Sequence, residues 1–553
     1  MYPSGKRAAF DGALAGAMLT VALISCLYAG WRLAGLPFVP FDLFDWFSRV
    51  LPGPVIEKSI GAMVAFIRAF HLGPIYSVAK HMEQAMGIGI FFISGVIGGA
   101  ILFPVIRALH GRKAYLAGLV LGAAAGGRAL FISSSVGLTA TVSPLARDLW
   151  IMGAYLLWGA AMGGVCRRLL PGREAAGVPI GQPEAEQGMA GQIDRRSFMV
   201  RLAGTAAAIT VVGAVVGKLS ALSYFSTSGR GGPGAVPWSE AHALPNAGAR
   251  VQPAPGTRPE FTPLEKHYRI DIDTVPPTID GRTWRLKTEG LVESPRYLTL
   301  DAIRRMKPMY QFITLACISN PVGGDLISTT RWTGTSLKDI LPFLRIKPQA
   351  THLKITSADG FWEVVSLAQV RADERIMLTY AWDGLPLERK HGFPLRIYIP
   401  DLYGMKQPKW IETIEAMDHW EPGYWVVRGW DKVARMKATS VIDTVAVRAA
   451  YKNAQGKTLI PVGGIAHAGV RGISRVELKV DNGPWRQAEL RTPISHTTWV
   501  IWRYDWAYAP GEHTFIVRCY DGNGAPQIET PEPPPPSGAS GYFSETKNIQ
   551  DPS

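Results

Sequence analysis

Residues 314–324 read TLACISNPVGG, and they place one of only four cysteines in 553 residues between an apolar, strand-like run and a glycine pair. Pro321 and the pair Gly323-Gly324 predict a bend directly after Cys317, because proline fixes φ and glycine accepts backbone angles that other residues avoid. A cysteine at such a bend is either a small apolar residue of a core or a reactive thiol at an open site. The cysteines show no close spacing, so the chain lacks a CxxC zinc pattern, a CxxCH haem-attachment motif and the look of a disulfide framework.

A second group of polar residues follows later in the chain. His391 opens the run HGFPLR, and Lys409-Trp410 close the run YGMKQPKW. Residues 226–553 contain no Walker loop, HExxH, GxSxG elbow or Rossmann glycine pattern, which argues against those enzyme classes. Candidate chemistry in this part of the chain therefore rests on Cys317 and on this second group.

The residues around these motifs predict two folded domains. Within 263–430, short β-type runs such as MYQFITLAC and IMLTYAW alternate with short helical runs, which predicts a mixed α+β domain. Within 437–527, apolar residues alternate at period two between turn residues, which predicts an all-β sandwich of immunoglobulin-like type. Residues 226–262 are rich in Gly, Pro and Ala and are interpreted as a linker, and 528–553 as an extended tail.

Residues 1–225 predict a helical transmembrane domain. A bilayer crossing needs about 20 apolar residues, and about five such runs occur, at 10–31, 86–107, 114–133, 148–166 and 201–225. Basic clusters alternate with these runs so that the N-terminus is expected in the cytoplasm and the second half outside it, on the periplasmic or extracellular side of the inner membrane. The run DRRSFM at 194–199 resembles a twin-arginine export signal. A net charge of +14 would suggest nucleic acid in a soluble protein, but here positive residues flank apolar runs, so we expect a lipid bilayer and no nucleic acid.

Taken in order, these motifs resemble the sulfite oxidase family of molybdenum-pterin enzymes over most of residues 263–527. The resemblance rests on CISN at 317–320, Arg331-Trp332, HGFPLR and the Lys409-Trp410 pair, followed by the predicted sandwich. It implies a molybdopterin cofactor and one molybdenum, with the Cys317 thiolate as the metal ligand and a catalytic group. Soft thiolate sulfur suits such a site, and cationic donors suit the phosphate of the pterin. The cofactor-binding residues that the resemblance implies are Tyr268, Arg269, Asn320, Arg331, His391, Arg396, Lys406 and Lys409.

Two departures from the family concern the substrate. Sulfite oxidases carry two arginines after the Cys-x-x-Asn motif, whereas this chain has Pro321 and Val322. The family's active-site tyrosine aligns one position away from Tyr424, or with Trp425 in its place. Tyr424 is therefore a candidate catalytic donor, and the missing arginine lowers the expected affinity for a dianion such as sulfite.

The resulting hypothesis is a membrane-anchored molybdopterin oxidoreductase that moves an oxygen atom to or from a small substrate. Its electrons pass to or from a separate partner, such as a cytochrome, a quinone or a membrane haem protein, and a homodimer is possible. Two alternatives stay open: a reductase of S-oxides or N-oxides fed through the membrane, and a cofactor-free, membrane-tethered binding protein.

Overall fold

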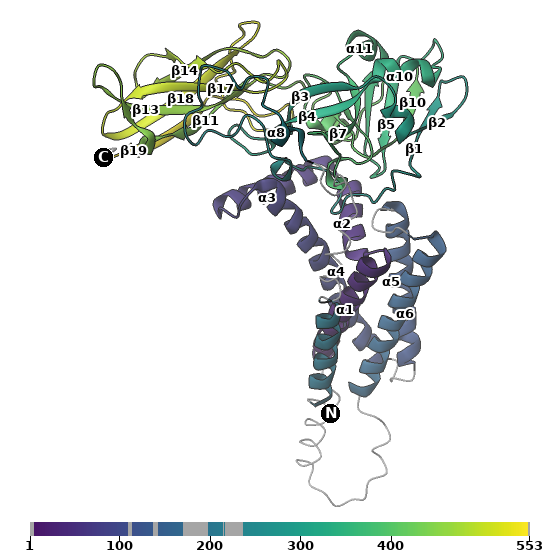
Figure 1. Cartoon of the computed structure of the whole chain (residues 1–553). Helices are drawn as coiled ribbons and strands as arrows, with labels where there is room; N and C mark the ends of the chain where they lie inside the picture. The colour runs from purple at the N-terminus through teal and green to yellow at the C-terminus, as the bar shows by residue number, and fades with distance from the viewer. Residues whose placement is uncertain are drawn as a thin grey trace, which may run out of the picture. The chain divides into compact units, whose positions relative to one another are not determined.

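The computed structural model describes residues 5–108, 113–136, 142–169, 197–213, 215 and 236–550 (Figure 1). These residues form two compact units. The helical unit comprises the described parts of 1–51, 80–228 and 272–278. The β-rich unit comprises the described parts of 52–79, 229–271 and 279–553.

Four helices are long and apolar enough to cross a membrane: α1 (Gly5–Ala34), α4 (Ile75–Ala108), α5 (Ala114–Val136) and α6 (Pro144–Leu169). They cover the first four predicted spans. The predicted fifth span, 201–225, begins on a shorter apolar helix, Ser197–Gly213, and otherwise falls largely outside the described residues. The paired arginines of the export-like motif also lie outside the described residues.

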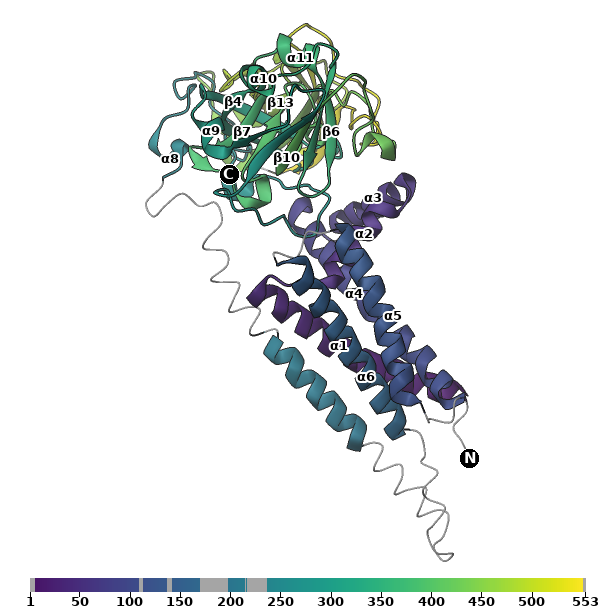
Figure 2. The ribbon, with the colours of Figure 1, turned by 90° about the vertical axis from the view of Figure 1, so that its right-hand side faces the viewer.

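Glycines allow the long helices of this unit to pack closely. A Cβ added at Gly118 of α5 would overlap the carbonyl oxygen of Gly159 of α6, and Gly12 of α1 meets Gly99 of α4 in the same way. Figures 1 and 2 both show α5 and α6 side by side. Small residues at helix contacts are typical of membrane bundles, because lipid gives no hydrophobic drive for helices to associate and close van der Waals contact must supply it.

A short segment from the second half of the sequence, residues 272–278, belongs to the helical unit. Thr274 donates to the carboxylate of Asp45 on α2 (Val39–Val50), from its backbone nitrogen at 2.9 Å and from Oγ1 at 3.0 Å. Arg49 pairs with the buried Asp273 at 3.0 Å, and Lys80 donates to the Asp273 carbonyl at 2.9 Å. Conversely, a segment from the first half of the sequence belongs to the β-rich unit. This is helix α3 (Gly53–Ala69), whose Gly53 lies against the carbonyl of Arg428.

The first domain of the β-rich unit contains two sheets. One has the strand order β2-β1-β10-β5-β6, and the other has β3-β4-β7-β8 with β9 paired to β7. Strands β1 and β10 run parallel although most of the domain separates them in sequence. The bounds of the first sheet are β1 (Arg285–Gly290), β2 (Arg296–Thr299), β5 (His352–Ser357), β6 (Trp362–Ser366) and β10 (Ile411–Met417). Those of the second are β3 (Met309–Ala316), β4 (Ile327–Ser336), β7 (Met377–Trp382), β8 (Leu385–Pro386) and β9 (Arg396–Tyr398).

Short helices cover this domain and complete its core. Helices α9 (Leu300–Arg304), α10 (Leu337–Leu344) and α11 (Leu367–Ala372) lie beside the strands in Figure 2. Leu286 of β1, Leu378 of β7 and Ile340 of α10 are fully buried in one cluster, so both sheets and the helices share a single apolar core. Mixed α and β elements occur as the sequence predicts. Single-turn helices complete the list, at η2 (Leu264–Lys266), η3 (Arg389–His391), η4 (Gly404–Lys406) and η5 (Val426–Arg428).

The second domain of this unit consists of two antiparallel sheets around one core. Val462 and Trp502 from the first sheet and Val476 and Val517 from the second are all fully buried there. The first sheet holds β11 (Thr439–Val445), β12 (Tyr451–Lys452), β13 (Thr458–His467), β16 (Glu489–Leu490) and β17 (Val500–Ala507), with η6 (Val447–Ala449) beside it. The second holds β14 (Ile473–Val480), β15 (Arg486–Gln487), β18 (Gly511–Asp521) and β19 (Phe543–Ile549).

The described parts of the two segments that the sequence assigned to a linker and a tail, residues 236–262 and 528–550, are packed in the β-rich unit. Strand β19 pairs with β18, and Ile549 is buried in the core, so the second sheet continues past residue 527. Residues 236–262 include α8 (Trp238–Ala241), and Arg258 there binds the Asp443 carboxylate on β11. Composition predicted flexible connections, whereas specific ion pairs and strand pairing fix these residues.

Candidate functional site

Cys317 lies in a tight loop between two paired strands. It follows β3 directly, and its backbone nitrogen donates to the Leu326 carbonyl at 2.9 Å just before β4 begins. The side chain of Asn320 accepts from the Leu326 nitrogen at 2.9 Å, which closes the loop, and Gly323 turns the chain with φ of 82°. The loop therefore holds the Cys317 thiol at the strand end. Asn320 has a structural contact here, and its role toward a cofactor stays a prediction.

The environment of the Cys317 sulfur is buried and polarised. Its Sγ lies 3.0 Å from the hydroxyl of Ser319, and the residue is 7% exposed. Burial raises the pKa of the thiol, while hydrogen bonds from Ser319 and the charge of Lys409 act in the opposite direction. A free thiol here would be protonated at neutral pH, so a positively charged metal ion is the kind of partner that would hold it as a thiolate.

Three of the predicted residues meet at a cationic cluster in the same domain. Lys409 Nζ lies 3.0 Å from the Asp271 carboxylate and 3.0 Å from the Ile270 carbonyl, and Arg269 reaches the same carboxylate at 2.7 Å. Burial lowers the pKa of Lys409 to about 8. Asp271 thus receives two cations, and it fixes the chain that carries Tyr268 and Arg269 beside Lys409.

Arg396 lies beside this cluster and is 5% exposed. Its Nη1 donates to the His391 carbonyl at 3.1 Å, and its guanidinium stacks 4.7 Å from the centre of the Trp332 ring. Burial lowers the pKa of Arg396 to about 10. Among the described residues it forms no ion pair, which is costly for a buried guanidinium and predicts an anionic partner.

Four buried ring nitrogens next to Arg396 also lack hydrogen-bond partners among the described residues. They are Nε2 of His267 and His391 and Nε1 of Trp332 and Trp382. The rings are in mutual contact; His391 lies 4.5 Å from Trp382 and 5.3 Å from His267, centre to centre. Burial lowers the pKa of His267 to about 3 and that of His391 well below its usual value, so both are neutral at pH 7.

This donor set fits a phosphate-bearing group with several acceptor atoms. Each buried, unsatisfied donor costs about 1–3 kcal/mol, and native structures rarely leave several together without a reason. A pterin phosphate beside Arg396 and Lys409 would neutralise the cations, and the heterocycle would supply acceptors for the ring nitrogens. Tyr268, which is buried, lies near enough to feel the charges of both Cys317 and Arg396, so the cluster continues to the thiol.

Two predicted cofactor residues lie elsewhere. Lys406 pairs with Glu363 at 3.0 Å, and both side chains are almost fully buried. Arg331 stacks on Tyr310 and Trp238, at 4.4 and 4.9 Å. Since successive side chains of a strand point to opposite faces, β4 directs Trp332 to the Arg396 cluster and Arg331 away from it. The structure thus does not bring Arg331 together with the other predicted residues.

Tyr424 and its neighbour take different positions. Trp425 packs against the apolar cluster that contains Cys317. Tyr424 packs against Phe361 and Trp362, 5.4 and 5.3 Å away, and under the guanidinium of Arg428. Of the two alternatives left open by the sequence, the contacts favour Trp425 as the one nearer the thiol.

Tyr403 is a candidate that the sequence analysis missed. It is buried in the same cluster as Cys317, and its hydroxyl accepts from the Lys437 backbone nitrogen at 3.2 Å. Burial raises its pKa, and the nearby Cys317 adds to that effect. Tyr403 opens the run YGMKQPKW, which the sequence analysis had singled out for Lys409. His267 and Asp271 were missed in the same way, since they lie next to the predicted residues Tyr268 and Arg269. The sequence signal for all three is that they are neighbours of a recognised motif.

Comparisons with known proteins agree with this assignment of the cofactor. Residues 273–425 match the family model for the oxidoreductase molybdopterin binding domain. The chain is 27% identical over 304 residues to mitochondrial sulfite oxidase of Rattus norvegicus, which covers 46% of this chain and 55% of that protein. It is 26% identical over 153 residues to the putative protein-methionine-sulfoxide reductase subunit YedZ1 of Azospira oryzae, which covers 28% of this chain and 56% of that protein.

Among solved structures, the sulfane dehydrogenase SoxCD from Paracoccus pantotrophus aligns with a TM-score of 0.45 and 19% identity. The alignment covers 57% of this chain and 93% of that one. The chain spans about half the length of the curated relatives described above.

Proposed function

This chain belongs to the sulfite oxidase-type family of molybdopterin enzymes, and from that premise we propose that it is an oxidoreductase that transfers an oxygen atom to or from a small substrate. The observation that carries the proposal is the buried Arg396, which donates to the His391 carbonyl but has no ion-pair partner among the described residues. It lies beside four ring nitrogens that lack hydrogen-bond partners in the same part of the chain, in the domain that also holds the Cys317 thiol. A packed domain without a cofactor has no use for such an arrangement.

Each group of residues has a role in holding the cofactor. Arg396 and Lys409 would bind its phosphate, the buried histidines and tryptophans would receive its heteroatoms, and Cys317 would ligate molybdenum through sulfur. Asp271 forms ion pairs with Lys409 and Arg269 and so holds both side chains in position. The cofactor-free binding protein, left open by the sequence, is not carried further, because the domain family binds molybdopterin with molybdenum.

The bound molybdenum supplies two-electron redox chemistry coupled to oxygen-atom transfer. In the oxidative direction water provides the oxygen atom of the product, two protons are released, and two electrons pass to the redox partner. In the reductive direction two electrons and two protons enter, and water leaves. The chain's own contribution is to bury Cys317 in one cluster with Tyr403, whose hydroxyl is neutral at physiological pH because burial raises its pKa.

The proposal also includes the location of the enzyme, its electron-transfer partner and its assembly. Four long apolar helices suit an anchor in the cytoplasmic membrane, with the catalytic part on its outer side as the basic clusters predict. A cytochrome, a quinone or a membrane haem protein would exchange the electrons. The immunoglobulin-like character of the sandwich and a homodimer formed through it remain part of this proposal.

Metal analysis and paired assays of the full-length, detergent-solubilised protein test it. We expect one molybdenum per chain and turnover either of sulfite with cytochrome c or of dimethyl sulfoxide with a reduced viologen dye. Protein purified from a host that makes the cofactor but containing no molybdenum would contradict the proposal.

The reductive direction is the second candidate, and a specific observation favours it. Pro321 and Val322 form the loop after Cys317, and neither offers a charge to an anionic substrate. A neutral S-oxide or N-oxide needs no such charge. Turnover of sulfite at a low KM would exclude this direction.

A further inference from the structure

The loop that carries Cys317 is bonded to a segment from the first half of the sequence. Helix α4 begins at Ile75, and the backbone nitrogen of this residue donates to the Asp325 carboxylate at 3.0 Å. Asp325 lies between Cys317 and the start of β4, and residues 52–79 belong to the β-rich unit together with this loop. A helix that is long and apolar enough to cross a membrane therefore begins on the loop of the proposed metal ligand.

The bond between Ile75 and Asp325 satisfies groups at both of its ends. The first backbone nitrogens of a helix have no partner within the helix, and the positive end of the helix dipole favours a carboxylate. Among the described residues, the bond from Ile75 is the only hydrogen bond of the Asp325 carboxylate, whose Oδ1 is buried without a partner. The Asp325 side chain thus depends on α4 for its position.

The first turn of α4 also packs against the surroundings of the thiol. Tyr76 contacts the buried apolar cluster that contains Cys317, Leu326 and Tyr403. Helix α4 has 34 residues, which is about 51 Å at 1.5 Å per residue, whereas the apolar core of a bilayer is about 30 Å thick. The helix is thus long enough to cross a membrane and still place its first turn in the β-rich unit.

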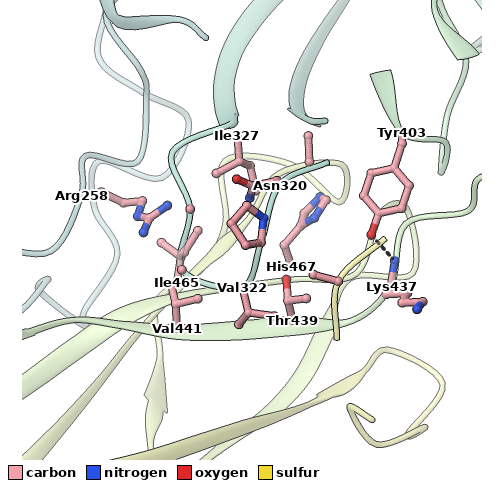
Figure 3. A pocket seen from close by; sticks show the side chains of 15 residues that line it. Arg258, Asn320, Val322, Ile327, Tyr403, Lys437, Thr439, Val441, Ile465 and His467 are labelled. Atoms are coloured by element: carbon pink, nitrogen blue, oxygen red, sulfur yellow. Dashed lines mark hydrogen bonds between the residues drawn. The ribbon is translucent and has the colours of Figure 1, made fainter. Parts of the chain in front are cut away.

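Packing leaves the Cys317 loop room to move on another side. Residues 320–324 line a cavity of about 30 Å³ inside the β-rich unit, together with Val441, Ile465 and His467 of the sandwich (Figure 3). This volume would hold about two water molecules. Protein interiors have few voids of that size, so hydrogen bonds rather than close packing must hold the loop here.

Leu326 follows Asp325 directly and joins it to the thiol. Its carbonyl accepts from the Cys317 nitrogen at 2.9 Å, and its own nitrogen donates to the Asn320 side chain at 2.9 Å. A displacement of Asp325 would therefore disturb both bonds that close the loop, and with them the position of the Cys317 sulfur.

We propose that Asp325 is a positioning residue of the molybdenum site, and that the first turn of α4 fixes the Cys317 loop through it. Ile75 and Tyr76 lie outside residues 273–425, the part of the chain that matches the family model, so this support comes from the half of the sequence that carries the long apolar helices. The inference deepens the function proposed above and rests on it.

The first test is a matched pair of substitutions at Ile75 in the full-length protein, produced in a host that cannot make the cofactor. Ile75→Pro removes the nitrogen-bound hydrogen that Asp325 accepts, and proline is well tolerated at the first position of a helix. Ile75→Ala shortens the same side chain but keeps that hydrogen. The readout is the rate at which iodoacetamide alkylates Cys317, followed on its peptide by mass spectrometry.

We expect Cys317 to be alkylated about tenfold faster in Ile75→Pro than in Ile75→Ala, because a hydrogen bond to a charged group favours the closed loop by about that factor or more. Equal rates in the two variants would overturn the proposal, since the bond would then not hold the loop.

The second test uses the molybdenum-loaded, full-length protein and compares Asp325→Ala with Asp325→Asn. The control is Asp339→Ala, because Asp339 is exposed on α10. In Asp325→Ala we expect shifted g-values in the electron paramagnetic resonance spectrum of Mo(V), because groups that orient a ligand tune the metal. We also expect kcat to fall about tenfold, with KM within about twofold of the wild type.

Asp325→Asn should restore the g-values and most of kcat, because its side-chain oxygen still accepts from the Ile75 nitrogen. Wild-type g-values in Asp325→Ala, or equal losses in the two variants, would overturn the proposal. A lower melting temperature with unchanged g-values would show a merely structural role and overturn it as well.

The two tests separate this inference from the function on which it rests. Absence of molybdenum from the wild type would remove the proposed function, whereas the alkylation rates need no cofactor and still decide whether α4 holds the Cys317 loop. The Ile75 pair also decides if Asp325→Ala fails to fold.

Discussion

Lys406 and Glu363 form an ion pair of 3.0 Å in which the two side chains are 5% and 2% exposed. Burial raises the pKa of Glu363, and Lys406 is the main group that opposes this effect. The pair joins η4 to β6. Its burial gives Lys406 a structural role that can be separated from cofactor binding.

Removing one partner of this pair should destabilise the protein strongly. For Lys406→Met we expect a loss of about 3–5 kcal/mol, because a buried charge then lacks compensation. The double variant Lys406→Met/Glu363→Leu should recover most of it. Thermal unfolding of the purified protein measures both. If Lys406→Met melts like the wild type but contains no molybdenum, Lys406 binds the cofactor directly instead.

The two buried cysteines of the β-rich unit should respond differently to substitution. Cys317→Ala should abolish molybdenum binding and turnover while the melting temperature of cofactor-free protein changes little, since the thiol would serve as a metal ligand. Cys519→Ala should retain molybdenum, because Cys519 is a fully buried core residue of β18. Metal analysis of both purified variants provides the comparison, and molybdenum at the wild-type level in Cys317→Ala would contradict the assignment.

Arg396 and Arg331 form a matched pair of arginines on adjacent parts of one sheet. Arg396→Met should lower cofactor content about tenfold or more, because a hydrogen bond to a charged group contributes about 1.5–3 kcal/mol and the phosphate would lose a buried partner. Arg331→Met should keep its cofactor, since Arg331 stacks on Tyr310 and Trp238. Fluorescence of the released, oxidised pterin quantifies both. Equal losses in the two variants would contradict this division.

Substitutions of Tyr403 and Tyr424 should have different effects on the kinetic constants. Tyr403→Phe removes a buried hydroxyl from the cluster that contains Cys317, and it should raise the KM by roughly threefold to tenfold with a smaller change in kcat, because one neutral hydrogen bond is lost. Tyr424→Phe should leave both constants near the wild-type values, because Tyr424 packs with Phe361 and Trp362 instead. Steady-state kinetics decides, and a large fall of kcat in Tyr424→Phe would restore its predicted catalytic role.

Acid should destabilise the β-rich unit through its buried histidines. Burial lowers the pKa of His467 to about 4 from an ordinary value near 6.5, so between these values the unfolded chain binds a proton that the folded chain does not. The stability contributed by the neutral ring is complete above pH 6.5 and is lost as the pH falls toward 4. The loss amounts to about 3 kcal/mol, because one pKa unit corresponds to about 1.4 kcal/mol.

The difference in melting temperature between wild type and His467→Asn, followed from pH 7 to pH 4, isolates this effect. Asparagine does not titrate in this range, so the variant should lose less stability on acidification. Parallel curves for the two proteins would show that His467 titrates normally.

The sequence predicted elements whose pattern is local, and it missed those whose pattern depends on distant partners. Apolar runs alone revealed α4, α5 and α6, and short β-type runs revealed β3 and β7. Strand β4, ISTTRWTGTS, is buried almost throughout although it is rich in threonine and serine, because it lies between β3 and β7. Strand β10 carries two glutamates and was missed for the same reason.

The same limit applies to the site. Cys317, His391, Arg396 and Lys409 could be recognised because each stands in a short motif. The face of the sheet to which Arg331 points depends on which residues of β4 face the core. The packing of Trp425 near Cys317 depends on the turn around η5. No short motif reports either. His467 comes from the sandwich, and only the fold brings it to the Cys317 loop.

The exchange of segments between the two units limits how this protein can be divided. Residues 272–278 belong to the helical unit, where Thr274 is bound by Asp45. Helix α3 comes early in the sequence but belongs to the β-rich unit. Dividing the chain within 214–235 would leave α3 on the fragment with the long apolar helices, and it would separate residues 272–278 from Asp45 and Arg49. The molybdopterin domain and the long apolar helices therefore cannot be treated as interchangeable modules, and a gene fusion that replaced one would have to rebuild the other.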